Sequence, residues 1–345
     1  MIQKENYTKE YIENLCKEKK IDITILERNI YALGLLEALI KVGLKFIFKG
    51  GTSLTILLDN PTRLSTDIDI VVEPDTDIQK YINEASKIFP FKDVKKDERK
   101  NKNKIIKEHY SFTYESPAFN RDFYILLDVV YEKNNYSKLL EKQIKNNFII
   151  TEKPYSSVLI PSIDCIMADK LTAFAPHTIG IQLNNDKDLE VIKQMYDISC
   201  LFDEIGSFKD LYDSYMKIAN TEISYRDIKI SPKDVLMDTI ESSVCIASRG
   251  QYGTEYDLYL NAINGLSQHI FDINFTGELA VLRACKVMYI ASCILKNKEP
   301  KKIEDYTKYH EKDISKSKYA VLGKIRNLEP LGFGYVVETI DLLNI

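Results

Sequence analysis

Two short stretches, Lys49-Gly50-Gly51-Thr52-Ser53 and Asp67-Ile68-Asp69, decide the fold. The first follows an apolar strand predicted at 45–48 and opens a short helix predicted at 54–58, with Thr52 or Ser53 near its N-cap. The second lies in an alternating strand predicted over 67–72. Successive side chains of a strand alternate between its faces, so Asp67 and Asp69 are expected to project together.

These residue types favour phosphate and metal chemistry. Gly50 and Gly51 let a ligand approach the backbone closely, and the start of a helix offers unbonded N–H groups to phosphate. Ser53 adds a hydroxyl donor. Two neighbouring carboxylates repel unless a cation lies between them, and a hard divalent ion is the natural partner. Each motif alone is weak, since an ordinary turn or a solvated edge strand has the same pattern.

A third carboxylate, Asp128, lies inside the apolar run 123–130, which is predicted to be a strand. A buried carboxylate without a partner costs several kcal/mol. Asp128 therefore has a partner or marks an exposed strand end, and a metal shared with Asp67 and Asp69 would supply the partner.

The remaining periodicity predicts an α+β protein with two parts. Helices are expected at 8–20, 23–42 and 77–88, and they alternate with strands as far as about residue 155. After Pro161 the chain looks helical, which predicts a domain at 1–155 and a helical domain at 156–345 that completes the cleft. Further helices are expected at 162–175, 187–205, 208–219, 231–248, 254–265, 276–296 and 335–343.

Composition narrows the class of protein further. Hydrophobic residues make up 45% of the 345 residues, charged residues 28%, and the net charge is −4. Such a chain is globular rather than disordered or fibrous, and its charge argues against a protein that coats nucleic acid. Six scattered cysteines without a CxxC pair, and no hydrophobic leader after Met1, predict a cytoplasmic protein with reduced thiols and no membrane span.

In combination, the glycine turn, the Asp-x-Asp pair and Asp128 match the pattern of the polymerase-beta-like nucleotidyltransferase fold. The stretch Lys49–Leu54, with Arg63-x-Ser65-x-Asp67-Ile68-Asp69, resembles the AbiEii/AbiGii-type nucleotidyltransferase toxins. Ala168-Asp169-Lys170-Leu171 and Tyr196-Asp197-Ile198 extend the resemblance. It covers about residues 28–205, and residues 206–345 carry no motif.

The resemblance implies a toxin of type IV toxin–antitoxin and phage-abortive systems. Such enzymes transfer a nucleoside monophosphate from a nucleoside triphosphate to an acceptor, which is the 3′ end of tRNA in some relatives. It implies Mg²⁺ or Mn²⁺ as cofactor and an antitoxin encoded nearby, with or without direct binding. A two-metal scheme fits, in which Asp67 and Asp69 hold the metal of the triphosphate and Asp128 joins them on the second. Asp128 is the candidate general base if one metal binds.

The resemblance adds Lys170 and Asp197 to the catalytic residues. Lys170 lies on an apolar stripe with Ile163 and Ile166, so its ammonium either escapes to the surface or reaches the triphosphate. Asp197 lies on a polar helix face, where periodicity predicts solvation and pairing with Lys193. The residues expected to bind the nucleotide and its phosphates are Gly50, Gly51, Thr52, Ser53, Arg63, Ser65 and Lys170.

Three further features leave their roles open. Arg63 and Ser65 brace the carboxylates or touch phosphate, whereas an exposed loop is the simpler alternative. Relatives often carry Arg where this chain has His177, which puts that phosphate contact in doubt. A basic run at 92–107 is a solvated loop or hairpin, or an RNA contact. The candidate RNA contacts are Lys95, Lys96, Arg99, Lys100, Lys102 and Lys104.

Two other functions remain open from the sequence. The same fold could modify a small molecule or a protein side chain, which the net acidity outside the basic run supports. Alternatively, the chain is a nucleotide-binding protein without catalysis. All three carboxylates and Ser53 are present, so the sequence shows no decay of the site.

Overall fold

The computed structural model describes residues 1–97, 105–271 and 273–345, which form two compact units. The strand unit contains Met1–Asn134, Lys138–Ser162 and Gln268–Ile273. The helical unit contains Asn135–Ser137, Ile163–Ser267 and Asn274–Ile345.

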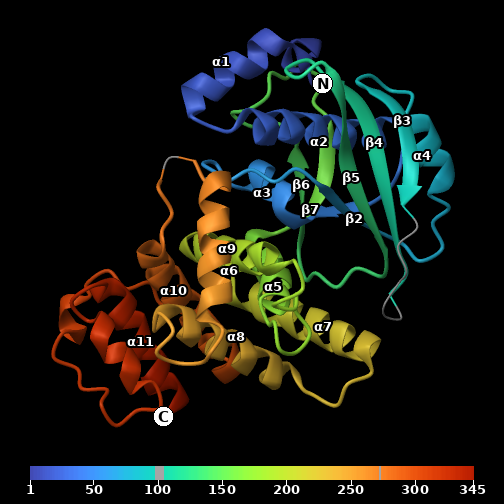
Figure 1. Cartoon of the computed structure of the whole chain (residues 1–345). Helices are drawn as coiled ribbons and strands as arrows, with labels where there is room; N and C mark the ends of the chain where they lie inside the picture. The colour runs from blue at the N-terminus through green and yellow to red at the C-terminus, as the bar shows by residue number, and fades with distance from the viewer. Residues whose placement is uncertain (98–104, 272) are drawn as a thin grey trace. The chain divides into compact units, whose positions relative to one another are not determined.

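A seven-stranded mixed sheet forms the strand unit, in the order β3-β4-β5-β2-β1-β7-β6 (Figure 1). Strand β2 pairs in parallel with β5 and antiparallel with β1, so it lies in the interior of the sheet beside both. The strands are β1 (Ile47–Lys49), β2 (Ile68–Val72), β3 (Phe91–Asp97), β4 (Lys107–Ser116), β5 (Arg121–Tyr131), β6 (Leu139–Gln143) and β7 (Ser157–Pro161).

The core of this unit is built on helix α2 (Ile23–Lys41). The Asp22 carboxylate caps its start by accepting hydrogen bonds from the backbone N–H groups of Thr24 and Ile25. Thirteen of its residues are buried, so the helix is enclosed rather than lying on the surface. Its Tyr31 ring stacks on Tyr114 of β4, with ring centroids 3.7 Å apart. The other helices of the unit are α1 (Lys9–Lys19), α3 (Gly50–Leu57) and α4 (Gln79–Ala85).

The helical unit packs its helices in pairs: α8 contacts α10, α10 contacts α6 and α11, and α5 contacts α6 and α7. Its core is apolar, and α10 alone buries thirteen residues. The helices are α5 (Ile163–Ala173), α6 (Asp188–Asp203), α7 (Phe208–Arg226), α8 (Pro232–Ala247), α9 (Tyr256–Leu266), α10 (Gly277–Lys296) and α11 (Pro330–Leu343).

The α+β class is confirmed, and each helix predicted after residue 161 is present, although α7 extends to Arg226 and α11 begins at Pro330. Three local expectations were incomplete. The basic run contributes a regular strand, β3, and the strands β4, β6 and β7 were not predicted. Helix α3 begins at Gly50, earlier than predicted, and its N-cap is Lys49 rather than Thr52 or Ser53.

Two findings concern the environment of the chain. No helix in the described residues has the length and apolar character needed to cross a bilayer. All six cysteines lie within the described part, and none of them forms a disulfide.

Candidate active site

The glycine turn and the Asp-x-Asp strand are in contact. Gly50 has a φ of +80°, a left-handed conformation that glycine adopts without steric cost. A Cβ at Gly50 would lie 2.0 Å from Asp69 Oδ2, so only a hydrogen fits there. A Cβ at Gly51 would lie 2.8 Å from Ser65 Oγ and 3.1 Å from Arg63 Nη2. The start of α3 is thus packed against a carboxylate and a guanidinium.

Two buried hydroxyls hold this turn in place. Thr52 Oγ1 donates a 2.6 Å hydrogen bond to the backbone carbonyl of Asp67, which ties α3 to the start of β2. Ser53 Oγ donates to the carbonyl of Gly50 at 2.8 Å. Both side chains are fully buried. The phosphate contacts predicted for Thr52 and Ser53 therefore stay predictions, because the hydroxyls serve the fold in this structure.

Sheet register brings Asp69 and Asp128 together. They are direct partners in the parallel pair β2–β5, so their side chains leave neighbouring strands on the same face. Lys49 of β1 is the partner of Asp69 on the other side, and His109 of β4 is the partner of Asp128. His109 Nδ1 lies 2.6 Å from Asp128 Oδ1. Two adjacent carboxylates are thus flanked by two basic residues.

The third predicted carboxylate, Asp67, lies just before β2 and contacts a different cation. Arg28 Nη2 of α2 is 3.6 Å from Asp67 Oδ1, and the Arg28 guanidinium lies 5.9 Å from the Tyr124 ring centroid. The Asp67 side chain is 44% exposed, so it remains open to a ligand. Sequence reasoning missed both Arg28 and His109; a charge inside the apolar helix 23–42 was the only signal for Arg28.

The carboxylates fit a divalent metal ion whose remaining ligands come from water and substrate. Within the described residues, no three His, Cys, Asp or Glu side chains form a ready-made metal cluster. Mg²⁺ usually binds through one or two carboxylates together with waters and substrate phosphates, so a complete protein cage is not needed. Asp69 and Asp128 supply two hard oxygen donors on adjacent strands.

Arg63 and Ser65 brace the site. Arg63 is only 7% exposed, and its backbone bridges to Ile270, so the exposed-loop interpretation is wrong. Asn29 Nδ2 donates a 2.7 Å hydrogen bond to the Ser65 carbonyl. These contacts fix the segment that leads into Asp67 and set the Arg63 guanidinium beside Gly51.

Lys170 of α5 and Asp197 of α6 form a buried ion pair inside the helical unit. The Lys170 ammonium is 2.6 Å from Asp197 Oδ2, and the two side chains are 5% and 2% exposed. Gln194 Oε1 accepts a second bond from Lys170, at 3.4 Å. The solvated Asp197 predicted from periodicity is wrong, because that helix face is covered; Lys193 pairs with Glu190 instead, at 2.7 Å.

His177 bridges two carboxylates. Its Nδ1 lies 2.7 Å from Asp238 Oδ1 and its Nε2 lies 2.7 Å from Glu255 Oε2. The hydrogen bond to Asp238 contributes most to raising the pKa of His177 to about 9, against the opposing effect of burial. At neutral pH the imidazole is therefore a cation with both nitrogens occupied, which argues for a structural role.

Only part of the basic run lies in the described residues. Arg99, Lys100, Lys102 and Lys104 fall outside them. Lys96 pairs with Glu108, whereas Lys95 is exposed and is the register partner of Ser111. Lys95 is two residues from Asp97, which pairs with His109, so Lys95 shares the sheet face of Asp128.

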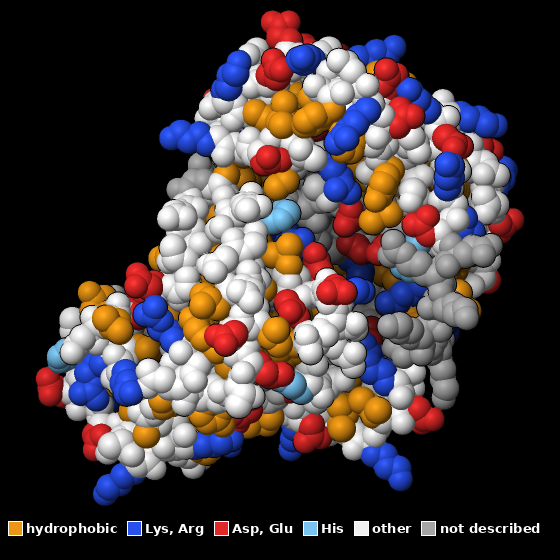
Figure 2. Space-filling model, in the orientation of Figure 1, with side chains coloured by type: hydrophobic (Ala, Val, Ile, Leu, Met, Phe, Trp, Pro, Cys, Tyr) orange, Lys and Arg blue, Asp and Glu red, His pale blue; other side chains and the backbone are white. Residues whose placement is uncertain are grey.

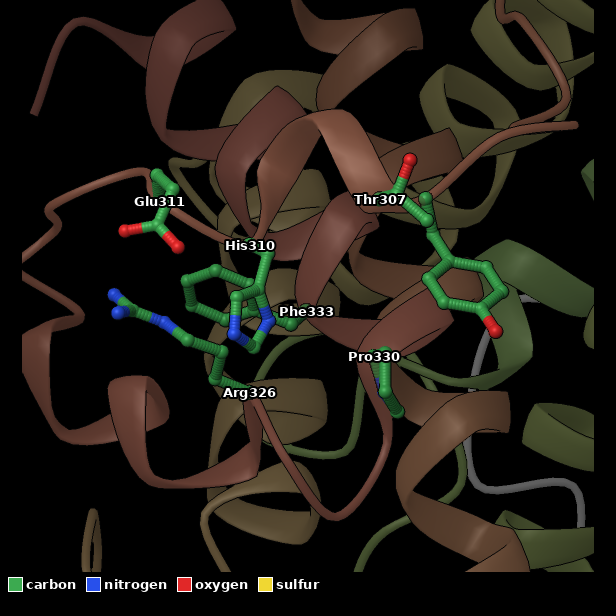
Figure 3. A pocket seen from close by; sticks show the side chains of 7 residues that line it. Thr307, His310, Glu311, Arg326, Pro330 and Phe333 are labelled. Atoms are coloured by element: carbon green, nitrogen blue, oxygen red, sulfur yellow. The ribbon is translucent and has the colours of Figure 1, made fainter.

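The helical unit also contains a pocket of about 390 Å³ beside α11. His310, Arg326 and Phe333 gather on one side of it, with Thr307 and Pro330 on the other (Figure 3). The Arg326 guanidinium lies over the Phe333 ring, 4.8 Å from its centroid. The pocket contains none of the residues predicted from the sequence.

Comparison with known proteins gives one family and several remote structures. The family described as "Nucleotidyl transferase AbiEii toxin, Type IV TA system" matches residues 35–255. No curated protein matches significantly. The crystal structure of JHP933 from Helicobacter pylori is 14% identical, with a TM-score of 0.44, over 79% of this chain and 93% of that one. A second H. pylori structure, titled as a candidate nucleotidyltransferase, is 14% identical, with a TM-score of 0.45, over 79% of this chain and 96% of that one.

The matched region contains the glycine turn, all three carboxylates and the Lys170–Asp197 pair. The chain is therefore a nucleotidyltransferase. It belongs to the AbiEii family of toxins from type IV toxin–antitoxin systems, which implies a nucleoside triphosphate as substrate and a cognate antitoxin.

Proposed function

We propose that the enzyme transfers a nucleoside monophosphate from a triphosphate to the 3′ end of tRNA. Asp67, Asp69 and Asp128 would hold Mg²⁺ or Mn²⁺ in a two-metal arrangement. The observation that carries the proposal is the register pairing of Asp69 with Asp128, together with the Asp69 carboxylate against Gly50. A metal-binding pair beside a phosphate-binding turn suits a metal–triphosphate substrate.

The bound metal would screen the phosphate charges and lower the pKa of the attacking hydroxyl. The protein would contribute binding and orientation. The N–H groups at the start of α3 can donate to phosphate oxygens, and the Arg63 guanidinium beside Gly51 adds a fixed positive charge. The Ser65 side chain also lies beside Gly51. The packing of Gly50 and Gly51 against Asp69, Ser65 and Arg63 supports this role for the donors.

In the transfer step, the acceptor hydroxyl oxygen forms a bond to the α-phosphorus. The bond from that phosphorus to the bridging oxygen breaks, and pyrophosphate leaves with the electron pair. With a single metal bound, Asp128 would accept the proton of the hydroxyl. Its side chain is 36% exposed, so an acceptor can reach it.

Lys170 and Asp197 enter the proposal through the family resemblance. Their side chains are buried and paired with each other. A structural role, in which the ion pair holds α5 against α6, is therefore the simpler one. A direct contact of Lys170 with triphosphate would require the buried ammonium, which Asp197 and Gln194 engage, to become accessible. The stability and activity of a variant that combines Lys170→Met with Asp197→Leu separate these two roles.

An RNA acceptor is supported by Lys95, an exposed cation on the face of the sheet that carries Asp128. Phosphate contacts of this kind supply much of the affinity for nucleic acid. A small molecule or a protein side chain is the alternative acceptor, and it predicts no labelling of RNA.

The test incubates the protein with each of the four labelled triphosphates, total tRNA, and Mg²⁺ or Mn²⁺. We expect label on tRNA with at least one triphosphate, and a loss of at least about 10³-fold in Asp69→Asn and Asp128→Asn. Asp122→Asn is the matched control, because Asp122 lies on β5 but is exposed and pairs with Lys92. Absence of tRNA labelling with all four triphosphates would overturn the proposal.

A further inference from the structure

His109 belongs to a row of ionisable side chains that crosses five neighbouring strands of the sheet. Register pairs it with Asp128 on one side and with Asp97 on the other, and the row continues through Asp69 to Lys49. All five residues project from the same face, because cross-strand partners share a face. His109 is thus built into the strand next to the reactive carboxylates, although nothing in the family motifs includes it.

The contact between His109 and Asp128 is short and sheltered. Nδ1 of the imidazole lies 2.6 Å from Asp128 Oδ1, and the two side chains are 15% and 36% exposed. An ionised carboxylate can only accept hydrogen bonds, so the imidazole N–H donates. Among the described side chains, no other hydrogen-bond partner of Asp128 is found.

This hydrogen bond restricts the rotation of the Asp128 side chain. A free aspartate rotates about its χ torsions, whereas Asp128 has one oxygen held in place by a neighbouring strand. The second oxygen remains available to a metal or to an acceptor proton. Hydrogen bonds to a ligating carboxylate from the surrounding shell orient it in the same way in metalloenzymes.

We propose that His109 is a positioning residue for nucleotidyl transfer, which acts by holding Asp128 in the orientation that receives the metal-bound substrate. The inference rests on the proposed function. It adds a residue of β4 to an active site whose family motifs lie on β2, α3 and β5.

The experiment compares His109→Ala, which removes the donor, with His109→Asn, whose side-chain amide can donate from nearly the same place. His310→Ala is the control, since His310 is exposed and belongs to the helical unit. For each variant, Mn²⁺ affinity is measured by calorimetry with a non-hydrolysable triphosphate present. The kcat and KM for the triphosphate are measured at the same fixed pH, and folding is checked by thermal denaturation.

We expect His109→Ala to weaken Mn²⁺ binding and to lower kcat by about 10- to 100-fold, with a smaller change in KM. His109→Asn should recover most of both losses, and His310→Ala should match the wild type. The inference fails if folded His109→Ala retains wild-type Mn²⁺ affinity and kcat, or if His109→Asn is no better than His109→Ala.

Failure of the proposed function would look different. In that case the wild-type protein itself would neither bind Mn²⁺ with triphosphate nor transfer a nucleotide, and the role of His109 would fall with it. A wild type that is active beside an unaffected His109→Ala would overturn only the positioning role.

Discussion

At the scale of single residues, Gly50 and Gly43 both adopt a left-handed backbone conformation and can be compared directly. Their φ angles are +80° and +81°. A Cβ at Gly43 would meet nothing within 4 Å, whereas one at Gly50 would collide with the Asp69 carboxylate. The two positions therefore carry the same conformational strain but differ in their surroundings.

We predict that Gly43→Ala and Gly50→Ala each lose about 1 kcal/mol of stability through backbone strain. Gly50→Ala must also displace Asp69, so nucleotidyl transfer should fall by at least about 10²-fold in this variant alone. Urea denaturation and the tRNA-labelling assay provide the two readouts. Equal activities in the two variants would show that the Gly50–Asp69 contact is unimportant.

A second residue pair, Lys170 and Asp197, tests the cost of a buried charge. Removing one partner leaves the other charged and buried, so Lys170→Met and Asp197→Leu should each lose about 3–5 kcal/mol of stability. The double variant should be more stable than either single variant, because neither charge then remains. Denaturation curves for all three provide the measurement.

Activity of the double variant separates the two roles of this pair. If Lys170 only supports α5 and α6, a folded double variant keeps most of its transfer activity. If the ammonium contacts triphosphate, activity is lost although the fold is restored.

At the scale of secondary-structure elements, His177 ties the segment after α5 to α8 and to the start of α9. It contacts Asp238 of α8 and Glu255, the N-cap of α9. Its pKa is about 9 in the folded protein and 6.5 is its ordinary value. A raised folded pKa means that the stabilisation is complete below pH 6.5 and is lost as pH rises through 9.

We therefore predict that the advantage of the wild type over His177→Gln shrinks by about 1 kcal/mol between pH 7 and pH 10, a value discounted because the side chain is half exposed. Denaturation at several pH values gives this difference directly. A constant difference across the range would contradict the bridging role of the charged imidazole.

The sheet shows which elements local pattern predicts. Helix α2 and strand β2 were predicted because apolar spacing and alternation are local properties. The partnership of His109 with Asp128 was missed, because it joins residues 19 apart on different strands, and register is not a local property. The Lys170–Asp197 pair was missed for the same reason: one helix alone does not show which of its polar faces another helix covers.

At the scale of the whole molecule, acidic and basic residues nearly balance. The net charge is −4, and acidic and basic side chains alternate over the face shown in Figure 2. An RNA acceptor must therefore be held by local cations, of which Lys95 is the clearest described example. Lys80 of α4 is an exposed lysine of the same unit and serves as its control.

We predict that Lys95→Ala raises the KM for tRNA about two- to three-fold and lowers the salt dependence of binding by about one ion, while Lys80→Ala changes neither. Binding measured at several salt concentrations gives the slope. Identical slopes in wild type and Lys95→Ala would remove the support that this strand gives to an RNA acceptor.

The strand unit draws on sequence from distant parts of the chain. Its last segment, Gln268–Ile273, returns to pair with the loop before β2, through the Phe271 N–H bonded to the Thr62 carbonyl and the bridge between Arg63 and Ile270. A ribosome must therefore synthesise more than three quarters of the polypeptide before the segment around Arg63 can pair with Ile270. A polypeptide that ends before Gln268 would therefore lack the strand that anchors Arg63, even though it contains the glycine turn and all three carboxylates.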